Sequence, residues 1–207
     1  NRNNRQAIKG WTNRWPGGIV PYSFHSSIKK RALISIEERT RKCIFTSLVR
    51  ILPFFFLFIF SIGGHDDGCW STLGISSHEI AHALGLFHEQ SRFDRDEFIT
   101  LISSRVPRNL LYNFAKASTR EISTYNLPYD VGSVMHYSPV EFTNQAGQPS
   151  LIARDSNLQQ TMGSVEGPSF LDIQIMNIHY GCARKCKKRV NCKNGGFIDS
   201  RDCTKCK

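Results

Sequence analysis

One stretch of this sequence determines how the rest is interpreted, and it reads His78-Glu79-Ile80-Ala81-His82-Ala83-Leu84-Gly85-Leu86-Phe87-His88. If its first half is an α-helix, His78 and His82 lie one turn apart on the same face. Gly85 then allows a left-handed turn without steric cost, and this turn can return His88 toward the other two rings. The spacing therefore predicts three imidazoles around one point.

Three imidazole ligands are typical of a catalytic zinc site, because they leave the fourth tetrahedral position open. A structural zinc would instead be closed by four protein ligands, usually including thiolates, and this motif contains no cysteine. We therefore predict that His78, His82 and His88 bind Zn²⁺. The alternative is an amphipathic helix with incidental histidines, but the five fixed positions would arise in only roughly 10⁻⁵ of shuffled sequences.

Glu79 follows the first histidine and has a different predicted role. Its carboxylate is placed to hydrogen-bond a water at the metal rather than to bind the metal itself. Zinc lowers the pKa of such a water to about 7, so a carboxylate can accept its proton at neutral pH. The predicted reaction is hydrolysis of an amide bond, with Glu79 as the general base.

Length and charge restrict the other functions that this chain could have. Its 207 residues suffice for one domain with a proper core and a small appendage. The formal charge of +10 is unevenly distributed: residues 1–50 carry +9, residues 51–182 carry −6 and residues 183–207 carry +7. This distribution argues against one continuous phosphate-binding face, so we predict no nucleic-acid partner.

The seven cysteines indicate an oxidising compartment, because four of them fall within the last 22 residues. Such a density is typical of a disulfide-stapled module. A zinc ribbon is the alternative, but it needs two Cys-x-x-Cys pairs, and only Cys203-Thr204-Lys205-Cys206 has that spacing. No signal peptide is visible, so we expect that it has been removed or that the chain is a piece of a longer precursor.

The remaining patterns predict a mixture of helices and strands. Gly18–Phe24 is expected to be a strand, and Ser27–Ile44 an amphipathic helix. The apolar run from Ile51 to Phe60 is shorter than the about 20 residues that span a bilayer, so we predict a buried strand and no membrane span. Its uniform composition leaves a translated non-coding insertion as the alternative. A capping box at Ser169 and Asp172 predicts a last helix.

Several segments together resemble one protein family. The zinc motif continues as Glu89-Gln90-Ser91-Arg92-Phe93-Asp94, Ser133-Val134-Met135-His136-Tyr137 comes later, and Trp15-Pro16-Gly17-Gly18 and Ser169-Phe170-Leu171-Asp172 lie near the two ends. Over residues 6–182 the chain resembles the astacin family of metalloendopeptidases. The resemblance implies an α+β fold of the metzincin type, with a twisted mixed sheet, two long helices and a loop-rich C-terminal half. It also implies a secreted zinc endopeptidase that acts on extracellular proteins.

The resemblance also implies roles for residues beyond the zinc ligands. Met135 would form a tight turn beneath the ligands, and Tyr137 would stabilise the oxyanion. Glu89 matches the glutamate that receives the new amino terminus once the protein's own propeptide is cut away. Residues 1–5 would be a remnant of that propeptide, and we expect cleavage after Arg5.

The family pattern also pairs the cysteines. It implies a disulfide between Cys43 and Cys182. Residues 183–207 resemble the first part of an EGF-like module, in which the implied pairs are Cys186 with Cys203 and Cys192 with Cys206. The expected protein is thus a multidomain astacin, cut within its EGF-like module.

The sequence departs from the family pattern in two places. A strand and a second cysteine are missing between Cys69 and the zinc helix, and this strand would pair with the substrate in the cleft. An alternative is therefore a catalytically impaired zinc-binding protein. Val165 replaces an arginine that many relatives place in the pocket after the scissile bond, so we expect an apolar or small side chain to fit there.

Two further expectations concern residues outside the motif. An alternative to a protease is a secreted interaction module, in which the basic, cysteine-rich end binds acidic glycans or proteins. Four histidines match no ligand position and are expected to be structural or surface residues: His25, His65, His136 and His179.

Overall fold

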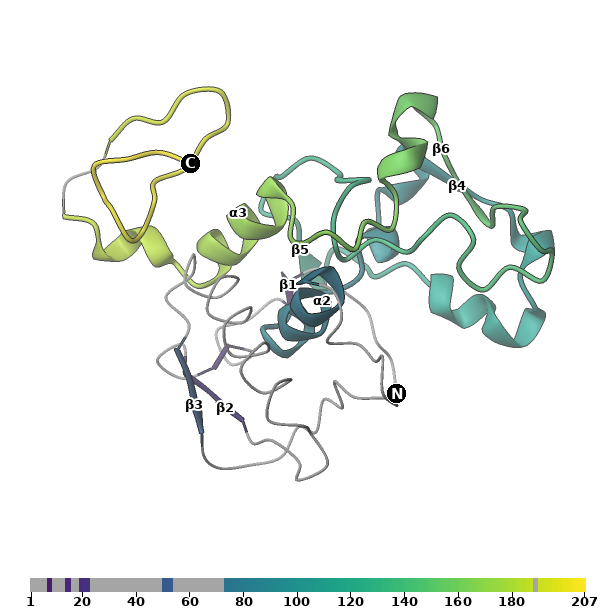
Figure 1. Cartoon of the computed structure of the whole chain (residues 1–207), viewed down its shortest axis with the longest axis horizontal. Helices are drawn as coiled ribbons and strands as arrows, with labels where there is room; N and C mark the ends of the chain where they lie inside the picture. The colour runs from purple at the N-terminus through teal and green to yellow at the C-terminus, as the bar shows by residue number, and fades with distance from the viewer. Residues whose placement is uncertain (1–6, 9–13, 16–18, 23–49, 54–72, 188–189) are drawn as a thin grey trace.

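The computed structural model describes residues 7–8, 14–15, 19–22, 50–53, 73–187 and 190–207. Its α-helices within these ranges are α2 (Leu73–Ala83) and α3 (Phe170–His179). Figure 1 shows them near the centre of the described chain. Short 3₁₀ helices join the loops: η3 (Glu89–Ser91), η4 (Arg95–Glu97), η5 (Ser103–Arg105), η6 (Arg108–Phe114), η7 (Ser156–Thr161) and η8 (Cys182–Lys185).

The strands form two-stranded pairs of both orientations. Strand β2 (Ile19–Tyr22) runs parallel to β3 (Arg50–Pro53). Antiparallel pairs join β1 (Ala7–Ile8) to β5 (Ile122–Ser123) and β4 (Ile99–Leu101) to β6 (Leu151–Ala153). The chain is thus a mixed α and β protein, as predicted. Among the described residues the three pairs are separate, so the single twisted sheet stays an expectation.

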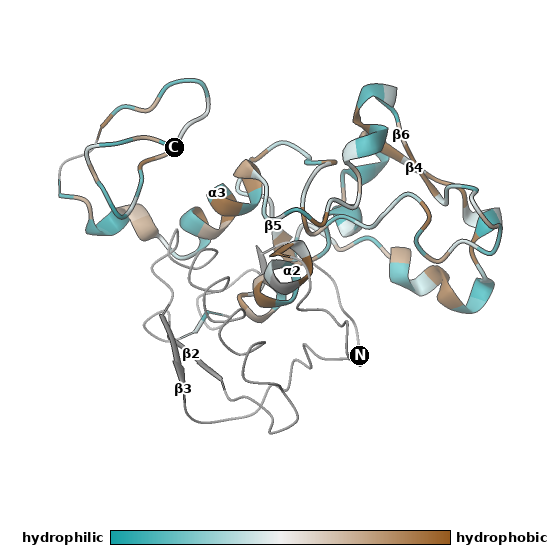
Figure 2. Cartoon of the chain, in the orientation of Figure 1, coloured by the Kyte–Doolittle hydropathy of each residue, from teal (hydrophilic) through white to brown (hydrophobic). Residues whose placement is uncertain are grey.

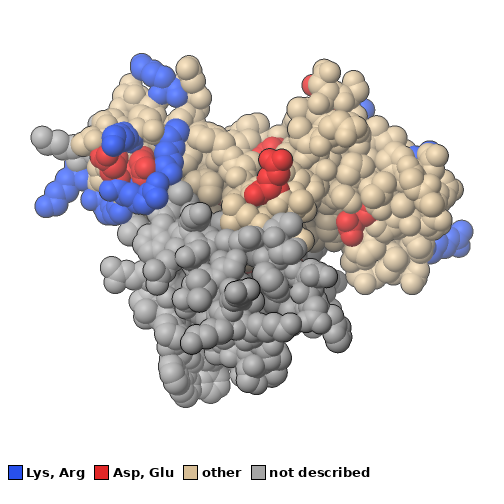
Figure 3. All heavy atoms as spheres, in the orientation of Figure 1, with Lys and Arg blue, Asp and Glu red and all other residues tan. Residues whose placement is uncertain are grey.

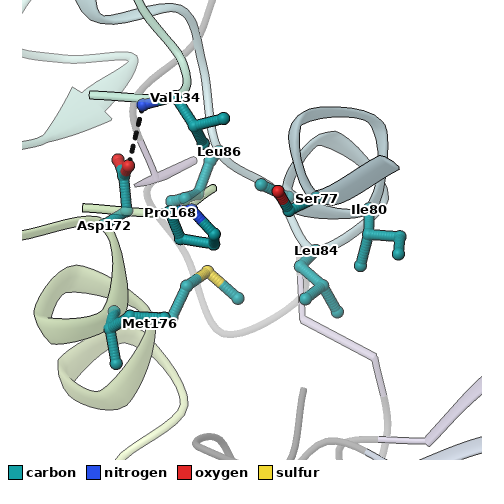
Figure 4. A pocket seen from close by; sticks show the side chains of 10 residues that line it. Ser77, Ile80, Leu84, Leu86, Val134, Pro168, Asp172 and Met176 are labelled. Carbon is teal, nitrogen blue, oxygen red and sulfur yellow. Dashed lines mark hydrogen bonds between the residues drawn. The ribbon is translucent and has the colours of Figure 1, made fainter. Parts of the chain in front are cut away.

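Two hydrophobic cores hold the described chain together. The first lies between the two α-helices and joins α2 to α3 through Ile80, Leu84, Val134, Met135 and Met176. Figure 4 shows Met176 of α3 and Leu84, directly after α2, pointing toward the same space. The second core surrounds the β4–β6 pair, whose residues are largely brown in Figure 2. Burial of apolar area in the first core fixes the helix that carries two of the three histidines of the motif.

The last helix begins where the capping box predicted it. The backbone N–H of Asp172 donates to Ser169 Oγ at 3.0 Å, and the Ser169 N–H donates back to Asp172 Oδ2 at 2.9 Å. Together these bonds satisfy two backbone donors that the first turn leaves without helical partners. Helix α3 ends before Gly181, which has a φ of +63°. The capping prediction is confirmed.

The C-terminal segment, residues 186–207, is held by disulfides. Cys186 is bonded to Cys203 and Cys192 to Cys206, with S–S distances of 2.01 and 1.99 Å. An isolated antiparallel β-bridge joins the backbones of Ile198 and Cys206. Figure 3 shows lysine and arginine side chains gathered on this segment, at the left of the view.

Several predictions fall outside the described residues: cleavage after Arg5, the helix at 27–44, most of the apolar run at 51–60, the Cys69 segment, and Cys43, the predicted partner of the buried Cys182. Among the helices that the structure does describe, none combines the length and apolar character needed to cross a membrane.

Candidate metal centre

Helix α2 ends in a turn that depends on Gly85. This residue has a φ of +94°, its N–H donates to the carbonyl of His82 at 3.0 Å, and the Leu86 N–H donates to the carbonyl of Ala81 at 2.9 Å. These two bonds define a Schellman motif, which favours glycine at the left-handed position. Leu86 and Ala81 also share the first core. The turn changes the direction of the chain at Gly85, three residues before His88, as the sequence predicted.

Side chains from distant segments cap the same end of α2. Trp15 Nε1 donates to the carbonyl of Ala83 at 2.7 Å, and the Tyr180 hydroxyl donates to the carbonyl of Leu84 at 3.1 Å. Carbonyls in the last turn of a helix lack helical partners, so each bond stabilises the helix end. The C-terminal end of α2 is therefore held by one residue that precedes it and one that follows it in the sequence, Trp15 and Tyr180.

The structure brings the three histidines of the motif together. The possible ligand atoms of His78, His82 and His88 all lie within 4.8 Å of one another. The ring centroids are 4.3 Å apart for His78 and His82, 5.2 Å for His78 and His88, and 5.4 Å for His82 and His88. His82 and His88 are buried, and His78 is half-buried. Among the described residues, no other group of histidines, cysteines or carboxylates converges in this way.

This donor set fits zinc. Three imidazole nitrogens bound at about 2.0–2.1 Å in tetrahedral geometry lie about 3.4 Å from one another. Nitrogens within 4.8 Å reach that spacing through small rotations of the side chains. Because no thiolate belongs to the group, the donor set matches a catalytic rather than a structural zinc.

The orientation of His78 is set by a backbone carbonyl. His78 Nδ1 lies 2.6 Å from the carbonyl oxygen of Val134. A carbonyl can only accept, so Nδ1 carries the proton and donates, which leaves the Nε2 lone pair for a metal.

The carbonyl of Val134 is in turn held in place by helix α3. The Val134 N–H donates to Asp172 Oδ2 at 2.9 Å, drawn in Figure 4, and the Ser133 hydroxyl donates to Asp172 Oδ1 at 2.6 Å. Burial raises the pKa of Asp172, and the hydrogen bonds that its carboxylate accepts from Ser133, Ser169 and Val134 oppose that rise. One buried carboxylate therefore links the start of α3 to the peptide that orients His78.

Met135 lies in a tight turn next to this link. The Ser133 N–H donates to the carbonyl of Asp130 at 3.1 Å, and the His136 N–H donates to the carbonyl of Ser133 at 3.0 Å. The Met135 side chain is 2% exposed and belongs to the first core, together with residues of α2. Its carbonyl accepts from the Glu89 N–H at 2.9 Å, so this turn also fixes the segment after His88.

Tyr137 stands beside the third histidine. Its ring centroid is 4.2 Å from that of His88, and its backbone N–H donates to Gln90 Oε1 at 3.1 Å. A cavity of about 270 Å³ opens here, and His78, His88 and Tyr137 all line it. Two of the three histidines, His78 and His88, thus face a space that a peptide side chain can enter.

The two glutamates of the motif have different surroundings. Glu79 follows His78 on α2 and is half-buried. Glu89 is 7% exposed, and its Oε1 accepts from Arg92 Nη1 at 3.1 Å and from the Asp130 N–H at 2.9 Å. Arg92 also binds Asp94, with Nη2 2.7 Å from Oδ2. Glu89 is therefore part of a buried ion pair that the sequence analysis missed, although Arg92 lies only three residues away.

The remaining described histidines are bound to protein groups. His136 Nε2 lies 2.8 Å from the Tyr129 hydroxyl, and His179 Nδ1 lies 2.9 Å from the Tyr125 hydroxyl. Burial lowers the pKa of His136 and of His179 to about 4. Both rings are therefore neutral at physiological pH, and neither joins the metal-binding group. His25 and His65 lie outside the described residues.

Two features of the cavity concern the departures from the family pattern, which are the segment before the zinc helix and Val165. Residues 73–77, directly before His78, are helical. Val165 lines the cavity and is 50% exposed, and its carbonyl accepts from the Gly74 N–H at 2.9 Å. The cavity also includes Glu141, which the sequence analysis missed because nothing in the local sequence places residue 141 beside α2.

The sequence of this chain is similar to a family model and to several known proteins. A family model described as Astacin, a family of peptidases, matches residues 60–181. The chain is 47% identical to zinc metalloproteinase nas-29 of Caenorhabditis elegans over 218 residues, covering 93% of this chain and 40% of that protein. It is 44% identical to zinc metalloproteinase nas-23 of the same species, covering 90% and 38%. The chain therefore spans about two fifths of these curated relatives.

Solved structures show the same fold. High choriolytic enzyme 1, a hatching enzyme zinc-protease from the medaka Oryzias latipes, aligns with a TM-score of 0.73 and 26% identity. The alignment covers 85% of this chain and 99% of that enzyme. Myroilysin aligns with a TM-score of 0.55 at 16% identity and supports the fold alone.

Proposed function

The chain belongs to the astacin family of peptidases, and from that premise we propose that it is a secreted zinc-dependent endopeptidase that hydrolyses peptide bonds of extracellular proteins. The observation that carries this proposal is the convergence of His78, His82 and His88 beside an open cavity. The names of the relatives, which are zinc metalloproteinases, support the same chemistry.

Zinc held by the three imidazoles would supply Lewis-acid chemistry, lowering the pKa of water and polarising the scissile carbonyl. Glu79 is the proposed general base: its carboxylate accepts the proton of the attacking water and passes it to the leaving amine. Its position beside His78 on α2 supports this role. Tyr137 is proposed to donate its phenolic O–H to the carbonyl oxygen as negative charge develops there. The contact of its ring with His88 supports that role.

Three further residues are proposed to support the site. Met135 is proposed to pack as an apolar side chain beneath the ligands, and Gly85 allows the turn between the second and third ligands. Glu89 is proposed to bind the amino terminus that forms when the propeptide is removed. The burial of its carboxylate and its pairing with Arg92 support a role in binding cations.

We propose the following organisation: residues 1–5 are a propeptide remnant, residues 6–182 are the catalytic domain, and residues 183–207 are part of an EGF-like module. The two disulfides, Cys186–Cys203 and Cys192–Cys206, support the third assignment, because they have the pairing expected for such a module. The disulfide between Cys43 and Cys182 is part of the proposal.

A peptidase assay on zinc-loaded protein tests this function, with Glu79→Gln as the matched variant. Loss of a general base slows such reactions by about 10²–10⁴-fold, so the variant should lose activity in that range while its zinc content stays unchanged. Equal, negligible turnover by both proteins would instead favour an impaired zinc-binding protein, an alternative that the named relatives do not support.

A further inference from the structure

The cavity beside His78 and His88 is lined by a carboxylate and, among the described residues, by no lysine or arginine. Apart from the two ligands His78 and His88, Glu141 is the charged residue among the described residues that line it, and neither lysine nor arginine is present there. Val165, which is half exposed, is one of the apolar residues that line the same cavity. A substrate side chain that enters this space therefore meets a negative charge.

The carboxylate of Glu141 is held in place by its own turn. The Ser138 hydroxyl donates to Glu141 Oε2 at 3.1 Å, and the Glu141 N–H donates to the carbonyl of Ser138 at 3.2 Å. The carbonyl of Glu141 accepts from the Ser150 hydroxyl at 2.7 Å. A carboxylate has about four acceptor positions, so the bond to Ser138 leaves capacity for an incoming donor. Because Glu141 is half-buried, water screens its charge less than at an open surface.

The other polar groups of the cavity do not offset this charge. His136 Nδ1 lies 2.8 Å from the carbonyl oxygen of Tyr137, and its Nε2 lies 2.8 Å from the Tyr129 hydroxyl. One ring nitrogen donates and the other accepts, which is the pattern of a neutral imidazole. A metal at the histidines would act on the scissile carbonyl of every substrate alike, so it does not discriminate between side chains. Selectivity between charged side chains is left to Glu141.

We propose that Glu141 is a specificity-determining residue, and that it selects substrates with lysine or arginine directly after the scissile bond. The inference rests on the proposed function and on the expectation that Val165 marks the pocket after that bond. Val165 alone favours a small or apolar residue at this substrate position, but the carboxylate of Glu141 in the same cavity favours a cationic one. Long cationic side chains fit because the cavity, at about 270 Å³, has room for one of them.

The test compares three fluorogenic peptides that differ only in the residue after the scissile bond, which is arginine, glutamine or glutamate. For the wild-type protein we expect kcat/KM to be at least about tenfold higher for arginine than for glutamate, with glutamine between them. In Glu141→Gln the difference between arginine and glutamate should fall to within about threefold. Glu166→Gln is the matched control, because Glu166 is exposed, follows Val165 and does not line the cavity.

A binding measurement separates this inference from the proposed function. Affinities of the same peptides for zinc-loaded Glu79→Gln, and for the same protein carrying Glu141→Gln, are measured by isothermal titration calorimetry. The preference for arginine should persist in binding even if catalysis itself were absent. Preference for glutamate, or a preference for arginine that survives Glu141→Gln in both measurements, would overturn the assignment.

Discussion

The metal centre and the C-terminal segment are stabilised in opposite ways. Around the histidines, α2 and α3 bury a shared apolar core, and the turn that orients His78 donates hydrogen bonds to the carboxylate of Asp172. In residues 186–207, only Cys186 and Ser200 are buried among the described residues, and two disulfides close the chain. A segment too small to bury a core depends on covalent links. A site that must place three nitrogens at one point depends on packed helices instead.

The two regions also differ in charge. Figure 3 shows lysine and arginine gathered on the C-terminal segment, where Asp199 and Asp202 pair with some of them. The sequence around the metal centre, residues 51–182, has a net charge of −6. Different physical treatments should therefore disrupt one region and leave the other intact.

Removal of the metal should have the largest effect and should act on the metal centre alone. Treatment with a chelator is expected to lower peptidase activity by more than about 10³-fold, because the Lewis acid for the reaction is lost. Hydrogen exchange in residues 190–207 should not change, since the disulfides there need no metal. Activity that survives complete removal of zinc would contradict the account.

The reverse experiment opens the C-terminal segment. Replacing Cys186 and Cys203 together by serine should lower the local free energy of unfolding by about 3 kcal/mol, because the lost link closes a loop with a sequence separation of 17. Limited proteolysis and hydrogen exchange measure this change. Zinc content and kcat/KM on a short peptide should stay within about twofold of wild type. A large loss of zinc would show that the two regions are coupled.

Asp172→Asn tests whether α3 positions the metal ligand through Val134. We expect zinc affinity, measured by competition with a chromophoric chelator, to fall by about 10- to 100-fold, as for other losses in the surroundings of a metal ligand. Ser169→Ala is the control, because it removes the other half of the capping box without touching the bonds of Ser133 and Val134. It should cost about 1 kcal/mol of stability and leave zinc affinity unchanged. Equal zinc affinities in the two variants would remove Asp172 from the positioning role.

Acid should weaken the metal-centre region through its buried histidines. The pKa of His136 and of His179 is about 4 in the folded protein, below the ordinary value of 6.5. Their contribution to stability is therefore present above about pH 6.5 and is lost as the pH falls toward about 4, by up to about 1.4 kcal/mol per pH unit for each ring. Urea unfolding of metal-free protein at several pH values measures the slope, and His179→Gln should reduce it. Identical slopes for the variant and wild type would contradict the buried, neutral state of His179.

Local patterns predicted the features that depend on neighbours in sequence. Spacing alone indicated the positions of His78 and His82 on one helix face and the left-handed turn at Gly85, and the capping box indicated where α3 begins. Each follows from backbone geometry over a few residues.

Contacts between distant segments could not be read in this way. Asp172 reaches Val134 across 38 positions, and Val134 reaches His78 across 56. Glu141 shares a cavity with His78 and His88 only because separate loops fold around it. The ion pair of Arg92 with Glu89 is local in sequence, but its burial depends on tertiary packing. Local sequence therefore predicts the convergence of the three histidines better than it predicts the residues that orient them.

The central claim is that His78, His82 and His88 together hold a single zinc ion. The most direct measurement is the zinc content of purified wild-type protein and of His82→Ala, by mass spectrometry of the metal, with circular dichroism to show that both are folded. The account predicts about one zinc ion per chain in wild type and almost none in the variant after dialysis. A wild-type protein that folds without tightly bound zinc, or a variant that retains the same zinc content, would contradict it.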